Sequence, residues 1–187
     1  RYLINSGGTL RIVGAEGNPA TIQAAAVDNY YYIRQDSGKV YADNYCIEGT
    51  NGNGLNIVGG TIDETHNFSN GMFSNSSGTA LLTIGEKVVI GDGFKKIDNV
   101  SFNARENKPT YNVQRTNGTK PITLTNYSGS LAGESHEKDT PGTLIIWEEP
   151  TGFVWTGEGD GKSWHDGENW AGGEVPGAAD EAYLKFV

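Results

Sequence analysis

The segment that decides the fold is Gly54-Leu55-Asn56-Ile57-Val58-Gly59-Gly60-Thr61-Ile62, in which two short β-type runs flank a pair of glycines. Apolar residues alternate with polar ones in these runs, which is the period of a β-strand and not of a helix. Glycines allow the chain to bend sharply between two strands. Short runs of this kind continue to Ile146 with almost no helical periodicity, so the sequence predicts an all-β chain.

The runs recur in larger cycles that separate two all-β architectures. A sandwich or barrel would favour Asn-Gly or Asp-Gly hairpins between strands of about five to six residues. Here the runs are often shorter, and the cycles begin near Gly8, Tyr30, Gly54, Ala80 and Asn99. A period of about 19–26 residues is typical of a solenoid. We therefore expect residues 1–146 to form a right-handed parallel β-helix of about five or six coils.

Aliphatic residues of these runs should form the interior of such a helix, because consecutive side chains of a strand point to opposite faces. We expect a stacked column of Ile12, Ile22, Ile33, Ile47, Ile57, Ile62, Leu82, Ile84, Val89, Phe102 and Val113. Burial of this apolar column would supply most of the stability. A polar replacement at Ile57 or Ile84 is therefore expected to be severely destabilising.

Composition and charge limit the classes of partner. The chain has 187 residues and a net charge of -9, from 14 basic and 23 acidic residues. Nucleic acids and anionic membranes reward basic patches, so neither is an expected partner. No apolar run approaches the roughly 18 residues of a membrane helix, and we expect no membrane insertion. The chain begins at Arg1 without an initiator methionine, and we expect it to be part of a longer chain.

The last forty residues differ in kind from the rest. Residues 147–187 carry 2 basic and 9 acidic residues and most of the tryptophans. The order Trp155-Thr156-Gly157, then Trp164, Asn169-Trp170 and Val175-Pro176 resembles a motif of large secreted bacterial surface proteins, in which it introduces a new β-structured module. The resemblance implies a junction over 147–187 that begins the next module. It further implies an extracellular or cell-surface protein of Bacteroidota-like bacteria, exported by a dedicated secretion system.

Right-handed β-helices resemble two families, the pectate-lyase type of polysaccharide lyases or hydrolases and the bacterial adhesins. A lyase needs a basic side chain to remove the proton alpha to a carboxylate, and the candidates are Arg105 and Lys108. A hydrolase needs paired carboxylates, for which Asp63-Glu64 and Asp92 are the entries in the sequence. All of these residues also suit solvated corners, and the sequence favours a non-catalytic role.

Aromatic and acidic residues supply the candidate binding sites. Exposed rings of Tyr31, Trp155, Trp164 and Trp170 could stack on sugar rings, whereas buried tryptophans would pin the junction. Carboxylates of acidic glycine-rich turns can bind calcium, and Asp160 and Asp166 are the candidates for this cofactor. A solvated acidic turn without an ion is the alternative.

We therefore expect a structural or adhesive segment of a bacterial surface protein. Its partners would be surface carbohydrate or other surface and secretion proteins. A polysaccharide lyase or hydrolase of β-helix fold, or a binder similar to a phage tail spike, remains the alternative.

Overall fold

The computed structural model describes residues 2–26, 29–105, 108–149, 153–178, 180 and 182–184. The chain divides into two compact units, Arg1–Glu148 and Glu149–Val187. Trp147, which we had assigned to the junction, lies in the first unit. Its main chain pairs with Leu124, and its ring contacts the rings of Phe102 and Tyr127.

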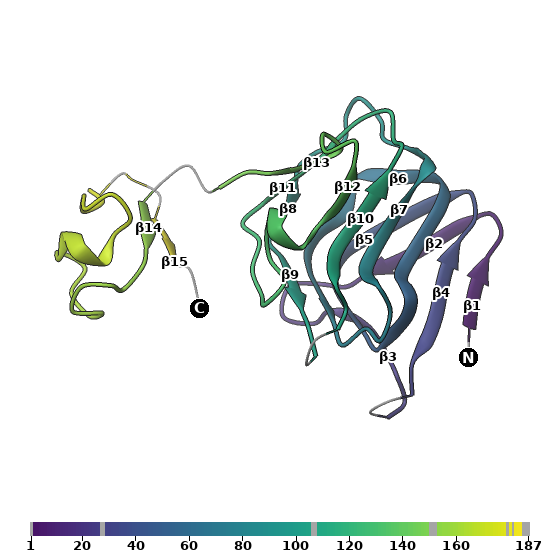
Figure 1. The fold of residues 1–187 in the computed structure, drawn as a ribbon, viewed down its shortest axis with the longest axis horizontal. Coiled ribbons are helices and arrows are strands. Elements are labelled where there is room, and N and C mark those ends of the chain that lie inside the picture. The colour runs from purple at the N-terminus through teal and green to yellow at the C-terminus, as the bar shows by residue number, and fades with distance from the viewer. Residues whose placement is uncertain are drawn as a thin grey trace. The chain divides into compact units, whose positions relative to one another are not determined.

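The first unit is a parallel β-solenoid of about five turns, which confirms the expected all-β, parallel β-helix class. Figure 1 shows strands of successive turns lying side by side. All pairings between its named strands are parallel within the described residues. The strands are β1 (Tyr2–Asn5), β2 (Thr9–Val13), β3 (Ala20–Gln23), β4 (Tyr31–Gln35), β5 (Lys39–Glu48), β6 (Thr50–Ser74), β7 (Ala80–Val89), β8 (Ile97–Asp98), β9 (Val100–Asn103), β10 (Tyr111–Thr116), β11 (Ile122–Thr125), β12 (Lys138–Thr140) and β13 (Ile145–Trp147). A short 3-10 helix, η1 (Glu134–His136), precedes β12.

Main-chain pairing sets the length of each turn. Ile33 pairs with Leu55, 22 residues later, whereas Leu82 pairs with Val113, 31 residues later. The turns are thus less regular than the predicted period of about 19–26 residues. The additional residues lie in loops at the corners, such as the segment 104–110 between β9 and β10.

The interior consists of several stacked columns and not of one. Leu55 and Leu82 are neighbours in one column, and Ile57 and Ile84 are neighbours in the next. In the column of β6 and β9, the rings of Phe73 and Phe102 stack with centroids 5.7 Å apart. Buried residues of this core include most of the predicted set: Ile12, Ile33, Ile47, Ile57, Ile62, Leu82, Ile84, Phe102 and Val113. Ile22 packs against the core as a partly buried residue.

Val89 was wrongly placed in the interior, because its side chain is 56% exposed. The register of β7 against β6 shifts between Ile57 and Gly59, where β7 has one residue more than β6. An extra residue reverses which side chains face inward. Val88 is consequently buried in its place, and Val89 faces solvent.

One corner of the solenoid is built from a column of asparagines. Asn44, Asn70, Asn99 and Asn126 each have a positive φ, between 47° and 54°. The left-handed region is costly for most residues, and asparagine tolerates it better than others. The side-chain amide of Asn70 donates to Asp43 (3.0 Å), and that of Asn99 donates to the Asn70 amide oxygen (3.2 Å). These bonds connect the corner of each turn to that of the turn before it.

The second unit contains two strands, β14 (Phe153–Trp155) and β15 (Ala182–Leu184), which pair in parallel. A 3-10 helix, η2 (Gly167–Asn169), lies between them in the sequence. The segment after 181, which we expected to begin a further β-element, thus contributes a strand that pairs with β14 inside this unit.

Replacement of Ile57 by alanine should lower the free energy of unfolding by about 2–5 kcal/mol, because it leaves a cavity in a fully buried column. Val89→Ala is the matched control, and we expect a change within about 0.5 kcal/mol because its side chain is largely exposed. Urea denaturation of both variants measures the difference. Equal losses would contradict the register shift described for β7.

Asn99→Ala should destabilise the solenoid by about 1 kcal/mol through the positive φ alone, whereas Asn99→Gly should cost less because glycine adopts this conformation freely. Thermal and urea unfolding of the two variants provide the measurement. An alanine variant as stable as the glycine variant would show that the corner is not strained.

Candidate functional site

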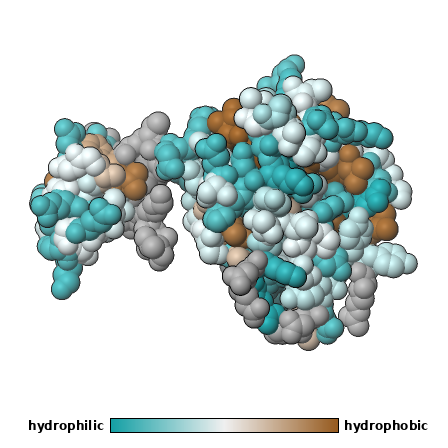
Figure 2. All heavy atoms as spheres, viewed as in Figure 1, coloured by the Kyte–Doolittle hydropathy of each residue, from teal (hydrophilic) through white to brown (hydrophobic). Residues whose placement is uncertain are grey.

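Hollows at the corners of the solenoid are the natural places to look for a site. The face of the molecule in Figure 2 is mostly hydrophilic, with small and separate hydrophobic patches. Ligand sites are concave, with apolar surface and a few converging polar groups. One hollow of about 250 Å³, here named the Tyr30 hollow, satisfies this description. It is lined by Gln23, Ala24, Ala26, Tyr30, Glu48, Gly49, Asn75 and Arg105.

The stacking of turns positions these side chains. Gln23 ends β3, Glu48 ends β5 and Asn75 follows β6, so each comes from the same corner of a successive turn. The side-chain amide of Asn75 donates to the Glu48 carboxylate. Gly49 lies so close to Ala24 that an added Cβ would be 2.7 Å from the Ala24 Cβ. Glycine is therefore required at that wall of the hollow.

The chemistry of the Tyr30 hollow suits a polyhydroxylated ligand. The Glu48 carboxylate accepts hydrogen bonds, the Arg105 guanidinium donates them, and the Gln23 amide does both. Sugar hydroxyls both donate and accept, so they can use all three. The Tyr30 ring contributes an aromatic surface on which the C–H face of a pyranose can stack.

Of the two lyase candidates, only Arg105 is among the residues that line this hollow. Arg105 and Lys108 form an antiparallel bridge, in which the Arg105 N–H donates to the Lys108 carbonyl (2.9 Å) and the reverse bond measures 3.2 Å. The main chain thus brings the two candidates together. The side chain of Lys108 is exposed, whereas Arg105 is half-buried.

Tyr31, the candidate ring on β4, has a structural position. Its hydroxyl donates to the Ile22 carbonyl (3.0 Å), and the side chain packs against the core. Burial raises the pKa of the Tyr31 hydroxyl well above its ordinary value. Its neighbour Tyr30 is the tyrosine that reaches the hollow.

The three tryptophans of the second unit form one cluster. Trp170 is 2% exposed, and its ring meets those of Trp155 and Trp164 edge to face, with centroids 5.0 and 4.5 Å away. Its indole N–H donates to the Trp164 carbonyl (2.8 Å). Trp170 is therefore the core of this unit. Trp164, which is 44% exposed, presents the most accessible ring of the cluster.

Asp160 and Asp166, the calcium candidates, both accept hydrogen bonds from nearby backbone. The Asp160 carboxylate accepts from the Ser163 N–H (2.7 Å) and from the Asn169 side chain (2.7 Å). These bonds, the one from Ser163 above all, hold the pKa of Asp160 below its usual range. Asp166 accepts from the Asp160 N–H (3.1 Å). Both carboxylates close turns, and the described part of the chain holds no cluster of three or more His, Cys, Asp or Glu side chains arranged for a metal.

The hydrolase candidates lie in ion pairs or against other loops. Asp63 pairs with Lys39 (3.0 Å), and Asp92 pairs with Lys120. The Glu64 carboxylate lies against the loop that contains Gly91 and Gly93.

Comparison of the chain with protein-family models, with curated proteins and with solved structures found no match. Among the described residues, no helix has the length and apolar character needed to cross a membrane.

Sequence reasoning did not find the Tyr30 hollow as a group. Its members lie between positions 23 and 105 and share no motif. The signal that relates them is their equivalent position at the ends of successive strands, and the irregular turn length hides it.

Trp170→Ala should unfold the second unit while the solenoid remains folded. Loss of a buried tryptophan costs about 3–5 kcal/mol, which is as much as a small core supplies. Trp164→Ala, with a more exposed ring, is the control and should leave the unit folded. Limited proteolysis followed by mass spectrometry will report cleavage after 149 in the first variant. Equal resistance of the two variants would disprove the central role of Trp170.

Proposed function

We propose that this chain is an adhesive segment of a large extracellular bacterial surface protein, and that its solenoid binds carbohydrate at the Tyr30 hollow. The observation that carries the proposal is the composition of that hollow. It combines one aromatic ring with an acid, a guanidinium and two amides on a scaffold of stacked turns. A rigid scaffold holds such groups in place without an entropic cost on binding.

The surface location is supported by the sequence. The C-terminal order of tryptophans resembles the junctions of secreted surface proteins, and the acidic composition suits neither nucleic acid nor anionic membrane. Export by a dedicated secretion machinery is part of the same proposal. The partners would be surface glycans or other surface proteins.

A polysaccharide lyase is the second candidate, and the position of Arg105 favours it over a hydrolase. Arg105 lies in the hollow together with Glu48, so a basic side chain would adjoin a bound sugar. Binding without cleavage separates the adhesin from the lyase. An assay for unsaturated sugar ends on acidic polysaccharides therefore accompanies the binding experiment.

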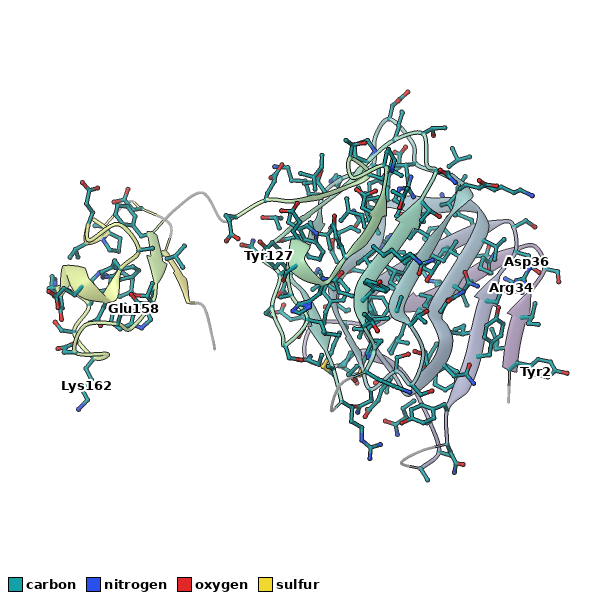
Figure 3. The ribbon with its side chains drawn as sticks, in the orientation of Figure 1. Tyr2, Arg34, Asp36, Tyr127, Glu158 and Lys162 are labelled. Atoms are coloured by element: carbon teal, nitrogen blue, oxygen red, sulfur yellow. The ribbon has the colours of Figure 1, made fainter. Side chains whose placement is uncertain are left out.

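Tyr30→Ala should weaken binding of the glycan selected on an array by about tenfold, or 1.4 kcal/mol, because the stacking surface is lost. The full chain is used for the array and for titration calorimetry with the selected glycan. Tyr2→Ala is the matched control, since Tyr2 is 79% exposed on β1, where Figure 3 labels it, and does not line the hollow.

Three outcomes would overturn the proposal in different ways. Absence of any bound glycan would exclude the adhesive function. Loss of binding in Trp164→Ala but not in Tyr30→Ala would move the site to the second unit. Turnover that disappears in Arg105→Gln with unchanged melting would replace the adhesin with a lyase.

A further inference from the structure

A second hollow of about 250 Å³ lies between the loop that follows β7 and the beginning of β11. It is lined by Ile90, Gly91, Asp92, Phe94, Lys95, Lys96, Lys120, Pro121 and Thr123. We name it the lysine hollow. Three of its side chains are cationic and one is anionic, in a chain whose net charge is -9. This local reversal of charge distinguishes it from the rest of the molecule.

The charges of the lysine hollow are only partly compensated. Lys120 pairs with Asp92, whose side chain is 97% exposed, and Lys96 pairs with Glu148. Exposed pairs of this kind contribute at most about 1 kcal/mol, so a ligand can replace either carboxylate. Lys95 has no ion-pair partner among the described residues of the chain. The hollow therefore offers ammonium groups to an incoming anion.

Buried polar side chains hold the backbone of all three lysines. Asn67, which is 1% exposed, donates from its amide to the carbonyls of Lys95 (2.7 Å) and Lys96 (3.2 Å). Arg115, which is fully buried, donates to the carbonyl of Lys120 (2.7 Å). Both anchors belong to neighbouring turns and are themselves fixed by packing. The lysine hollow is thus a preorganised arrangement and not a chance meeting of flexible surface chains.

Arg115 also contributes its own charge beneath the wall of the hollow. Its Nε and Nη1 atoms are buried and have no hydrogen-bond partner in the structure. Burial lowers the pKa of the Arg115 guanidinium, and the nearby Asp139 opposes this shift. Arginine remains charged in proteins, and a buried charge is screened less than a surface one. An anion at Lys120 would experience this additional attraction.

We propose that the lysine hollow binds the carboxylate or sulfate of an acidic sugar residue. The proposal rests on the proposed glycan-binding function and names the class of glycan. Phe94 and Pro121 supply apolar walls for the ring of the sugar, and Thr123 supplies a hydroxyl. The volume is below the roughly 300–1,000 Å³ of pockets for drug-sized ligands, so it fits one charged residue of a polymer. A nucleic acid, with one charge per about 1.7 Å of duplex, would be repelled by the remaining acidic surface.

The test compares three monosaccharides on the full chain by saturation-transfer NMR and titration. Galacturonate carries a carboxylate, galactose 6-sulfate carries a sulfate, and galactose carries neither. We expect at least one charged sugar to bind tenfold or more tightly than galactose, and this preference to weaken as the salt concentration rises. The arm that binds identifies which anion the hollow takes.

Lys95→Gln combined with Lys120→Gln should remove the preference for the charged sugar. Lys162→Gln is the control for charge, because Lys162 lies in the second unit and extends from the ribbon in Figure 3. All variants should melt at the temperature of the unaltered chain, which excludes unfolding as the cause of a loss.

Two results would overturn the inference. Equal binding of charged and neutral sugars, or a preference that survives in the double variant, would show that the lysines are not the site. Inorganic sulfate that binds as tightly as galactose 6-sulfate would show that the ring is not recognised. In both cases a neutral glycan that still depends on Tyr30 would leave the proposed function intact, so the two failures are distinguishable.

Discussion

Parallel pairing between successive turns is the constraint on which the solenoid depends. The N–H and carbonyl groups of a strand are satisfied only by the strand of the next turn, because parallel strands cannot pair within one turn. The same pairing places Leu55 against Leu82 and Ile57 against Ile84, so the hydrogen-bonded register and the apolar stack are one arrangement. β6 pairs with β4 and β5 on one side and with β7 and β9 on the other. A change in its register would therefore disturb both halves.

Corners are where this constraint is most demanding and where it leaves room for binding. At one corner, Gly38 and Gly60 lie so close to the glycine of the preceding turn that an added Cβ would be 1.9 and 2.2 Å from its carbonyl oxygen. At others, loops of different length connect the strands, and these loops carry the side chains of both hollows. A rigid scaffold with variable loops is a common basis for recognition.

Buried polar residues connect the core to the candidate sites. Asn67 and Arg115 occupy interior positions that aliphatic residues could fill, yet each donates to the main chain beneath a lysine. Polar groups in a low-dielectric interior are costly unless they are bonded, so these contacts hold the loop in one conformation. The second unit uses a different device, because its core is essentially the ring of Trp170 surrounded by other aromatic rings.

The sequence by itself determined the all-β class, the stacked parallel architecture and most of the buried aliphatic residues, such as Ile57 and Ile84. Alternation of side chains and the use of glycine at bends are local properties, and they can be recognised without the fold. The tertiary structure alone decided that Val89 faces outward, because one extra residue in β7 reverses the alternation. It also decided that Gln23, Tyr30 and Arg105 share one hollow. Turns of 22 to 31 residues offer no constant spacing by which such residues could be related, and only the long-range register brings them together.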